Sequence, residues 1–92
     1  MTDEELFPLG RIVMTPGIQS LIELTGFNPL VFVDRHSKGD WGDLSPSDTK
    51  ENEFSLKRRL RLFSAYKTVH GKVWVITEAD RSATTILLPD EY

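Results

Sequence analysis

The C-terminal segment, residues 72–92, constrains the fold more than any other part of the chain. Two runs rich in Val, Ile, Leu and Thr, residues 73–77 and 83–88, flank the polar turn 78–82. Residues of these types fit a pleated, half-buried surface, so the segment predicts a β-hairpin. Because a hairpin alone is only marginally stable in water, the rest of the chain must cover one of its faces.

Two further strands are predicted outside this hairpin. Polar and apolar residues alternate from Leu60, and His70-Gly71 is typical of the turn that joins such a strand to the hairpin. Residues 10–14 predict a short strand near the N-terminus. We therefore expect an antiparallel β-meander at about 60–88, together with an N-terminal edge strand.

Three helix starts precede the meander, and each is a capping residue followed by proline. They are Thr15-Pro16, Asn28-Pro29 and Ser45-Pro46. After the second start, a buried strand at 30–33 is the alternative to a helix that ends near His36. The start signal favours the helix. The prediction is an α+β fold: a small two-layer domain in which two or three short helices cover one face of the sheet.

The composition narrows the class of protein. The 92 residues are expected to form a single domain, 1–92, with residues 1–8 as a flexible acidic tail. The sequence has no cysteine, which excludes disulfides and a thiolate nucleophile and favours a reducing, cytoplasmic location. We expect no signal peptide and no membrane partner, because no apolar run reaches the roughly 18 residues of a membrane span. The net charge of −3 argues against nonspecific binding to nucleic acid.

The loop at 36–44 is the first candidate site. His36, Asp40 and Asp43 are residue types that bind divalent metals, with an acid from the turn 78–80 as a further ligand. The alternative is structural: Asp40 bonds loop amides and Trp41 fills the core. We favour Trp41 as an anchor of the loop over Trp41 as a contact for a partner.

We make a separate prediction for each of the two tryptophans. Trp41 has no periodic pattern around it, whereas Trp74 lies in the middle of a predicted strand. Lys72 and Glu78 share its face but lie toward the strand ends. Trp74 and Ile76 are therefore expected to face the core.

The turn 78–82 is the second candidate site. Glu78, Asp80 and Arg81 are suited to acid–base chemistry or to a phosphate clamp. The alternative is a hairpin loop whose polar side chains bond their own backbone.

The basic run at 57–61 is the third. Lys57, Arg58, Arg59 and Arg61 would contact phosphates of a nucleic acid. The alternative is a solvated helix end, since bases are favoured there by the helix dipole.

Five segments carry a resemblance to a known family. They are Arg35-His36, G-D-W-G-D-L at 39–44, E-N-E at 51–53, L-F-S-A-Y at 62–66 and I-T-E-A-D-R-S-A-T-T-I-L-L-P at 76–89. With them the chain resembles a family of small bacterial proteins of similar length, called plasmid-related or hypothetical, that are carried on plasmids and integrative elements. The resemblance implies a protein of a mobile genetic element. It supplies no activity and no site residues.

The leading prediction is a small intracellular accessory protein of a plasmid, phage or other mobile element that binds a macromolecular partner. That partner is expected to be a protein of a host defence, restriction or regulatory complex, with anti-defence inhibition as one outcome. The candidate surface consists of Asp40, Trp41, Asp43, Glu78, Asp80 and Arg81.

Two alternatives stay open. One is a nucleic-acid-binding protein that uses the basic run 57–61. The other is a metal-assisted hydrolase in which Asp40, Asp43 and Glu78 or Asp80 converge. The leading prediction itself includes no enzymatic activity, no catalytic residue, no metal ligand and no cofactor.

Overall fold

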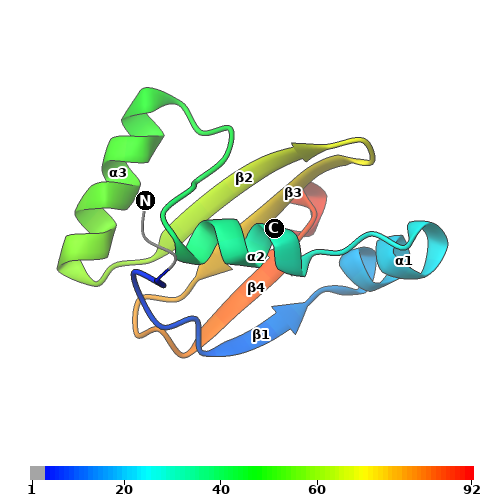
Figure 1. The fold of residues 1–92 in the computed structure, drawn as a ribbon, viewed down its shortest axis with the longest axis horizontal. Coiled ribbons are helices and arrows are strands. Elements are labelled where there is room, and N and C mark those ends of the chain that lie inside the picture. The colour runs from blue at the N-terminus through cyan, green and yellow to red at the C-terminus, as the bar shows by residue number, and fades with distance from the viewer. Residues whose placement is uncertain (1–3) are drawn as a thin grey trace.

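A mixed β-sheet forms one layer of the protein (Figure 1). The computed structural model describes residues 4–92. The strands are β1 (Arg11–Met14), β2 (Leu62–Thr68), β3 (Gly71–Thr77) and β4 (Ala83–Leu87). They lie in the order β1-β4-β3-β2. β2, β3 and β4 form an antiparallel meander, and β1 pairs with β4 in parallel at the edge. The predicted meander and edge strand are confirmed.

Three helices form the second layer within residues 4–92 (Figure 1). They are α1 (Pro16–Thr25), α2 (Leu30–Ser37) and α3 (Pro46–Arg58), and a 3-10 turn, η1 (Pro89–Glu91), follows β4. α2 lies across one face of the sheet, α3 lies beside the β2 edge and α1 lies beyond the end of β1, so that within residues 4–92 no α-helix lies across the opposite face (Figure 1). The α+β two-layer fold is therefore confirmed, as is a helix rather than a strand at 30–33.

α1 and α3 begin where their capping residues predict, and α2 begins one residue later than Asn28-Pro29 predicts, at Leu30. The Thr15 hydroxyl accepts a hydrogen bond from the Ile18 amide at 3.4 Å, and Ser45 Oγ accepts one from the Asp48 amide at 3.2 Å. Each bond satisfies an amide that the first helical turn leaves unpaired. α1 ends at Gly26, whose φ of 73° is left-handed and suits a residue without Cβ.

The main core lies between the sheet and the helices. Its buried residues are Ile18, Val33, Tyr66, Val73, Val75 and Ile86. Since side chains alternate along a strand, Val73 and Val75 toward the helices place Trp74 and Ile76 on the opposite face. The expectation that Trp74 faces the core was wrong. Short branched side chains, not the indole, lie on the side of β3 that α2 covers.

Phe7 belongs to a second core cluster, with Trp41 and Leu62. Its ring lies 6.2 Å from the ring of Trp41 in a stacked arrangement, and its side chain is 5% exposed. The Leu6 amide donates to the Ser37 carbonyl at 2.8 Å. Residues 1–3 of the predicted tail lie outside the described residues. At Phe7, however, the tail prediction was wrong, because an aromatic ring there completes the core.

A chain of hydrogen bonds runs through the core from His36. Its Nδ1 lies 2.5 Å from Ser64 Oγ, and its Nε2 lies 2.9 Å from Thr77 Oγ1. Thr77 Oγ1 lies 2.7 Å from Thr84 Oγ1, which donates to the Leu9 carbonyl at 2.7 Å. A carbonyl only accepts, so Thr77 must donate to Thr84 and accept from His36. The order of donors thus assigns a proton to Nε2, and burial keeps the imidazole neutral, with Nδ1 accepting from Ser64.

Burial, together with the nearby positive charge of Arg81, lowers the pKa of His36 to about 3. In the unfolded chain a histidine takes up its proton near pH 6.5. Below that pH the unfolded state therefore binds a proton that the folded state does not. The stability that depends on neutral His36 is complete above about pH 6.5 and is lost as the pH falls toward 3.

We expect this loss of stability at low pH to depend on the His36 side chain. Between pH 6 and 4, the free energy of unfolding of the wild-type protein should fall by about 1.4 kcal/mol per pH unit more than that of His36→Gln. Glutamine offers a donor and an acceptor but does not titrate. Urea unfolding at several pH values measures the slopes. His70→Gln, at an exposed position, is the matched control and should keep the wild-type slope. Equal slopes for wild type and His36→Gln would contradict the assignment.

Candidate functional site

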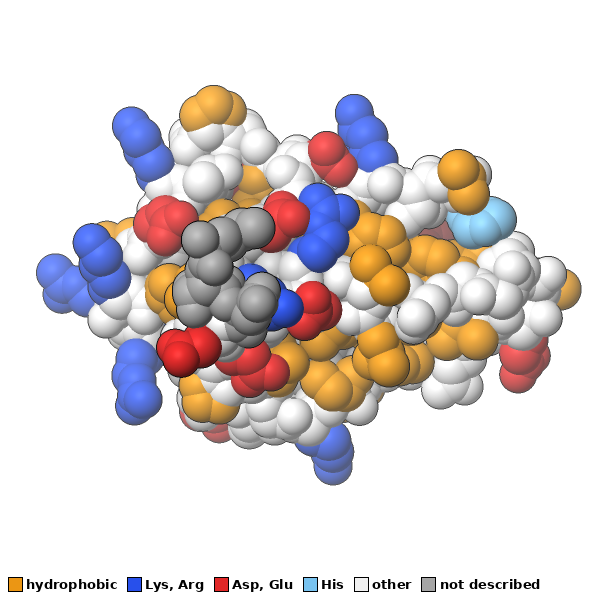
Figure 2. Space-filling view, viewed as in Figure 1, with side chains coloured by type: hydrophobic (Ala, Val, Ile, Leu, Met, Phe, Trp, Pro, Cys, Tyr) orange, Lys and Arg blue, Asp and Glu red, His pale blue; other side chains and the backbone are white. Residues whose placement is uncertain are grey.

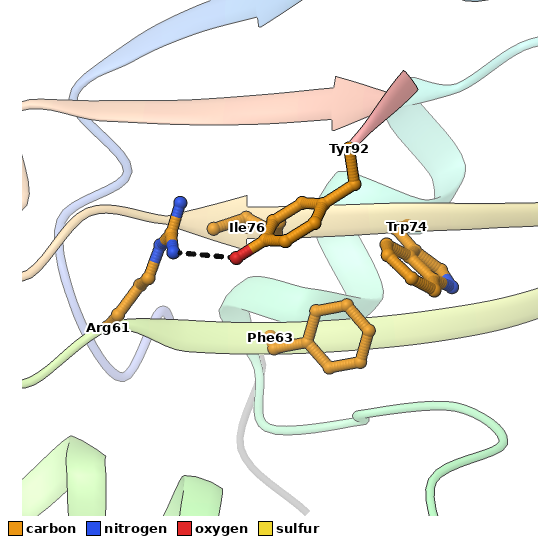
Figure 3. A pocket seen from close by; sticks show the side chains of 5 residues that line it. All are labelled: Arg61, Phe63, Trp74, Ile76 and Tyr92. Carbon is orange, nitrogen blue, oxygen red and sulfur yellow. Dashed lines mark hydrogen bonds between the residues drawn. The ribbon is translucent and has the colours of Figure 1, made fainter. Parts of the chain in front are cut away.

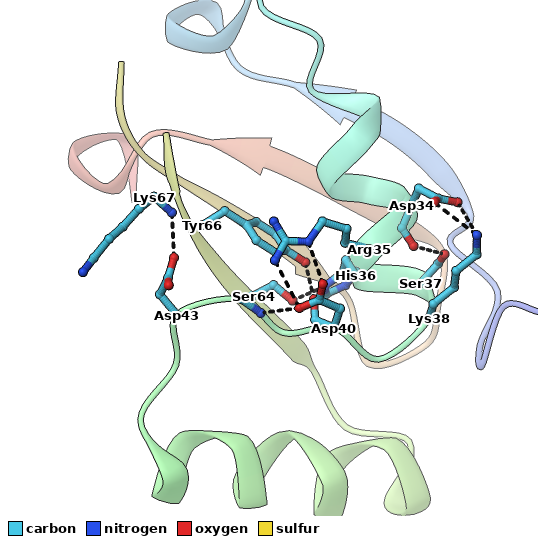
Figure 4. Close-up of polar contacts among 11 residues, drawn as sticks. Asp34, Arg35, His36, Ser37, Lys38, Asp40, Asp43, Ser64, Tyr66 and Lys67 are labelled. Carbon is cyan, nitrogen blue, oxygen red and sulfur yellow. Dashed lines mark hydrogen bonds and ion pairs between the residues drawn. The ribbon is translucent and has the colours of Figure 1, made fainter. Parts of the chain in front are cut away.

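The loop between α2 and α3 covers the outer edge of β2 (Figure 4). The Asp43 amide donates to the Ala65 carbonyl at 2.6 Å, and the Ala65 amide donates to the Trp41 carbonyl at 3.2 Å. The Lys67 amide donates to Asp43 Oδ2 at 2.8 Å. Gly42, with a φ of 77°, lies so close to the Ala65 carbonyl that a Cβ would clash with it. Asp43 therefore protects a sheet edge that would otherwise be open to another strand.

Asn52 of α3 completes this protection at Phe63. Its Oδ1 accepts from the Phe63 amide at 3.1 Å, and its Nδ2 donates to the Phe63 carbonyl. A side-chain amide matches a backbone amide in this way because each offers one donor direction and one acceptor. The backbone groups of Phe63 and Ala65 that face away from β3 are thus occupied, which makes this edge unsuitable for adding a strand.

Asp40 is held by Arg35 (Figure 4). Arg35 Nε donates to Asp40 Oδ2 at 2.6 Å, and the Gly42 amide donates to Asp40 Oδ1 at 3.2 Å. The Arg35 hydrogen bond lowers the pKa of Asp40. The guanidinium carbon of Arg35 also lies 4.7 Å from the centre of the Tyr66 ring, and the Tyr66 hydroxyl donates to the Asp40 carbonyl at 2.6 Å. Asp40 therefore fixes the loop, and Arg35 is the partner that the sequence reasoning missed.

Trp41 lies in the core, with 4% of its side chain exposed. It packs against Phe7 and Leu62, and its Nε1 lies 3.4 Å from Glu53 Oε1. Trp41, a member of the candidate surface, is thus out of reach of a partner unless the loop opens.

The turn 78–82 is built around Arg81, which is 9% exposed and has a left-handed φ of 62°. Its Nη1 donates to the carbonyls of Leu60, Glu78 and Ala79 at 2.7, 3.1 and 3.3 Å. Asp80 Oδ1 accepts from the Ser82 amide at 3.0 Å. Arg81 therefore joins the turn to the end of α3, so its guanidinium does not face solvent as a phosphate clamp requires.

The basic run is divided between two parts of the surface. Lys57 and Arg58 lie in the last turn of α3, and Arg59 caps that helix with a φ of 57°. The Arg58 guanidinium lies 5.2 Å from the Phe54 ring. Arg61 instead lies on the helix-free face of the sheet (Figure 3). On the helix-covered face, most Lys and Arg side chains are spread around the rim rather than gathered into one patch (Figure 2).

The residues of the predicted metal site are not brought together. Asp40 and Asp43 lie at the β2 edge, whereas Glu78 and Asp80 lie at the turn between β3 and β4. Within residues 4–92, no group of three or more histidine, aspartate or glutamate side chains is arranged to hold a metal ion. His36 uses both ring nitrogens in the core network.

The helix-free face carries a site that the sequence reasoning did not find. A cavity of about 300 Å³ opens there (Figure 3). It is lined by Arg61, Phe63, Trp74, Ile76 and Tyr92. The Trp74 ring centre lies 4.9 Å from that of Phe63 and 5.7 Å from that of Tyr92, both edge to face. Arg61 Nη1 donates to the Tyr92 hydroxyl at 3.0 Å.

Two further cavities, of about 350 and 360 Å³, adjoin the first. All three share Arg61, so together they form one groove across β2, β3 and β4, which we name the Arg61 groove. The second cavity adds Glu78, Thr85, Leu87 and Glu91 to the lining. The third adds Asp48, Glu51, Asn52 and Ser55. The groove is thus aromatic at its centre and carries carboxylates at both ends.

A sequence signal for the groove does exist. Phe63 and Lys67 share one face of β2 with Arg61, the residue directly before the strand, while Lys72 and Trp74 share the same face of β3. A strand face that mixes aromatic and charged residues is typical of a surface in contact with solvent. The charges on either side of Trp74 therefore mark a solvent-facing side of the strand rather than strand ends.

Comparisons with protein-family models, curated proteins and solved structures find no match to this chain. The resemblance to plasmid-borne proteins therefore stays a prediction. No helix within residues 4–92 has the length and apolar character needed to cross a membrane.

The placement of Trp41 leads to a stability prediction. Trp41→Ala removes a buried indole between Phe7 and Leu62 and should lower the free energy of unfolding by about 3–5 kcal/mol. Thermal or urea unfolding followed by circular dichroism measures the change. Trp74→Ala, on the half-exposed opposite face, is the comparison and should lose less. An unchanged melting temperature for Trp41→Ala would show that the loop is not anchored by this residue.

Proposed function

We propose that the protein is a non-catalytic binding module that holds a protein partner in the Arg61 groove. The observation that carries this proposal is the trio of Phe63, Trp74 and Tyr92 around an open cavity on the helix-free face. Tyr92 is 70% exposed. Aromatic side chains at the surface are enriched at the centres of protein interfaces, where they bury large areas with little loss of side-chain freedom.

The proposed surface differs from the one that the sequence suggested. Asp40, Asp43 and Arg81 are engaged in holding the loop and the turn in place. Glu78 is the member of the predicted surface that lines the groove. From the resemblance we add the proposal that the partner belongs to a host defence or regulatory complex met by a mobile element.

Single-stranded nucleic acid is the second candidate occupant. Lys67 and Lys72 are paired across β2 and β3 on the groove face, and exposed rings stack on bases. Neither lysine lines the three cavities, whose ends are acidic. Phosphates would approach carboxylates there, so a protein partner is favoured.

Site-specific photo-crosslinking in a bacterial host tests the proposal. With benzoylphenylalanine in place of Phe63, we expect one protein to crosslink in a stoichiometric amount. With the same residue in place of Leu24, which is 84% exposed on α1, that protein should not crosslink. Nuclease treatment should leave the product intact.

A second change separates contact from folding. Trp74→Thr keeps a residue that suits a strand but removes the indole, and it should abolish the crosslink from position 63 while the melting transition remains cooperative. A crosslink that is equal from positions 63 and 24, or that consists of nucleic acid, would overturn the proposal.

A further inference from the structure

We propose that the Arg61 groove recognises a basic segment of its protein partner, with an arginine or lysine side chain laid on Phe63 and Trp74. This inference rests on the proposed function and names the chemistry of the partner at that site.

The charge of the groove is the first observation. Among residues 4–92, the three cavities are lined by one cationic side chain, Arg61. Four carboxylates line them as well: Asp48, Glu51, Glu78 and Glu91. The lining of the groove therefore has an excess of negative charge, and a cationic partner complements it.

The carboxylates at the two ends differ in how they are used. Glu91 accepts hydrogen bonds from the Thr15 hydroxyl at 2.6 Å and from the Gly17 and Leu88 amides, both at 2.9 Å. Glu78 Oε2 lies 3.7 Å from Arg61 Nη2. Within residues 4–92, no hydrogen bond or ion pair engages the carboxylates of Asp48 and Glu51. At the end of the groove near α3, Asp48 and Glu51 thus form no ion pair, although Arg61 also lines that cavity.

Arg61 shows how the groove holds a guanidinium. Its guanidinium carbon lies 5.6 Å from the centre of the Tyr92 ring, and Nη1 donates to the Tyr92 hydroxyl at 3.0 Å. Glu78 supplies the carboxylate. One cation is therefore already bound by a ring, a hydroxyl and an acid from this same surface.

Around Phe63 and Trp74 the groove offers two further rings, and within residues 4–92 no cation lies over either of them. Trp74 is the aromatic residue type that attracts cations most strongly, yet among residues 4–92 no Lys or Arg lies over its ring. Phe63 lies beside it and also lines the adjoining cavity of Asp48 and Glu51. A basic side chain on Phe63 and Trp74 would match the arrangement that Arg61 makes with Tyr92 and Glu78.

Titration with defined probes tests this inference. The probes are an eight-residue blocked peptide of alternating arginine and glycine, the same peptide with glutamate for arginine, and an eight-nucleotide oligothymidylate. The indole N–H resonance of Trp74, assigned with Trp74→Phe, reports binding, and that of buried Trp41 is the internal control. We expect the arginine peptide to shift the Trp74 resonance saturably and to leave that of Trp41 in place. Added salt should weaken the binding.

Matched variants test whether the carboxylates of Asp48 and Glu51 bind the arginine peptide. Asp48→Asn with Glu51→Gln should weaken binding of the arginine peptide about fivefold, since exposed ion pairs contribute modestly. Glu5→Gln with Glu23→Gln removes the same charge from exposed positions that line none of the three cavities and should leave binding unchanged. Tighter binding of the glutamate peptide or the oligothymidylate, or no shift with the arginine peptide at about 5 mM, would overturn the inference.

Different results would refute the binding module and the basic segment of its partner. A partner that crosslinks at position 63 through a neutral or acidic segment, identified by mass spectrometry, would overturn the basic segment and keep the binding module. Loss of that specific crosslink would remove the binding module itself, whatever the peptides do.

Discussion

The rest of the structure depends on the buried hydrogen-bond chain of His36. It joins α2 to β2 through Ser64, to β3 through Thr77, and through Thr84 of β4 to the segment before β1. Buried polar groups are costly when unpaired, so each member is stable only when the others are in place. The hydrogen-bond chain thus favours one position of α2 across the sheet, whereas apolar contacts alone would allow several positions.

The two faces of the sheet therefore differ in role. The face under the helices is closed by the core and by the His36 chain, and the β2 edge is closed by Asp43 and Asn52. Within residues 4–92 no α-helix lies across the opposite face, which carries the Arg61 groove, and α3 borders one end of that groove. Because its aromatic side chains are not needed to hold the helices, they remain available to a partner.

Local signals in the sequence predicted the elements well. The cap-plus-proline pairs gave the three helix starts, and alternation gave the meander, since both patterns act within a few residues. A period of two does not say which face is covered, so Trp74 was assigned to the wrong side. Arg35, Phe7 and the parallel pairing of β1 with β4 depend on contacts between distant segments. The groove is formed by β2, β3, β4 and the C-terminal turn together, and no single sequence motif predicts it.

The parallel pairing of β1 with β4 also affects when the protein can fold. Arg11 lies opposite Ala83 in the register, and Ile86 of β4 belongs to the main core. A chain still emerging from the ribosome holds β1, the three helices and β2–β3 before it has the strand that joins them. Contacts so distant in sequence form slowly, and they leave apolar surface exposed until they close. A nascent chain that ends before Ala83 therefore has the β2–β3 hairpin and β1 but lacks the strand that joins them, and its dependence on chaperones should be greatest at that length.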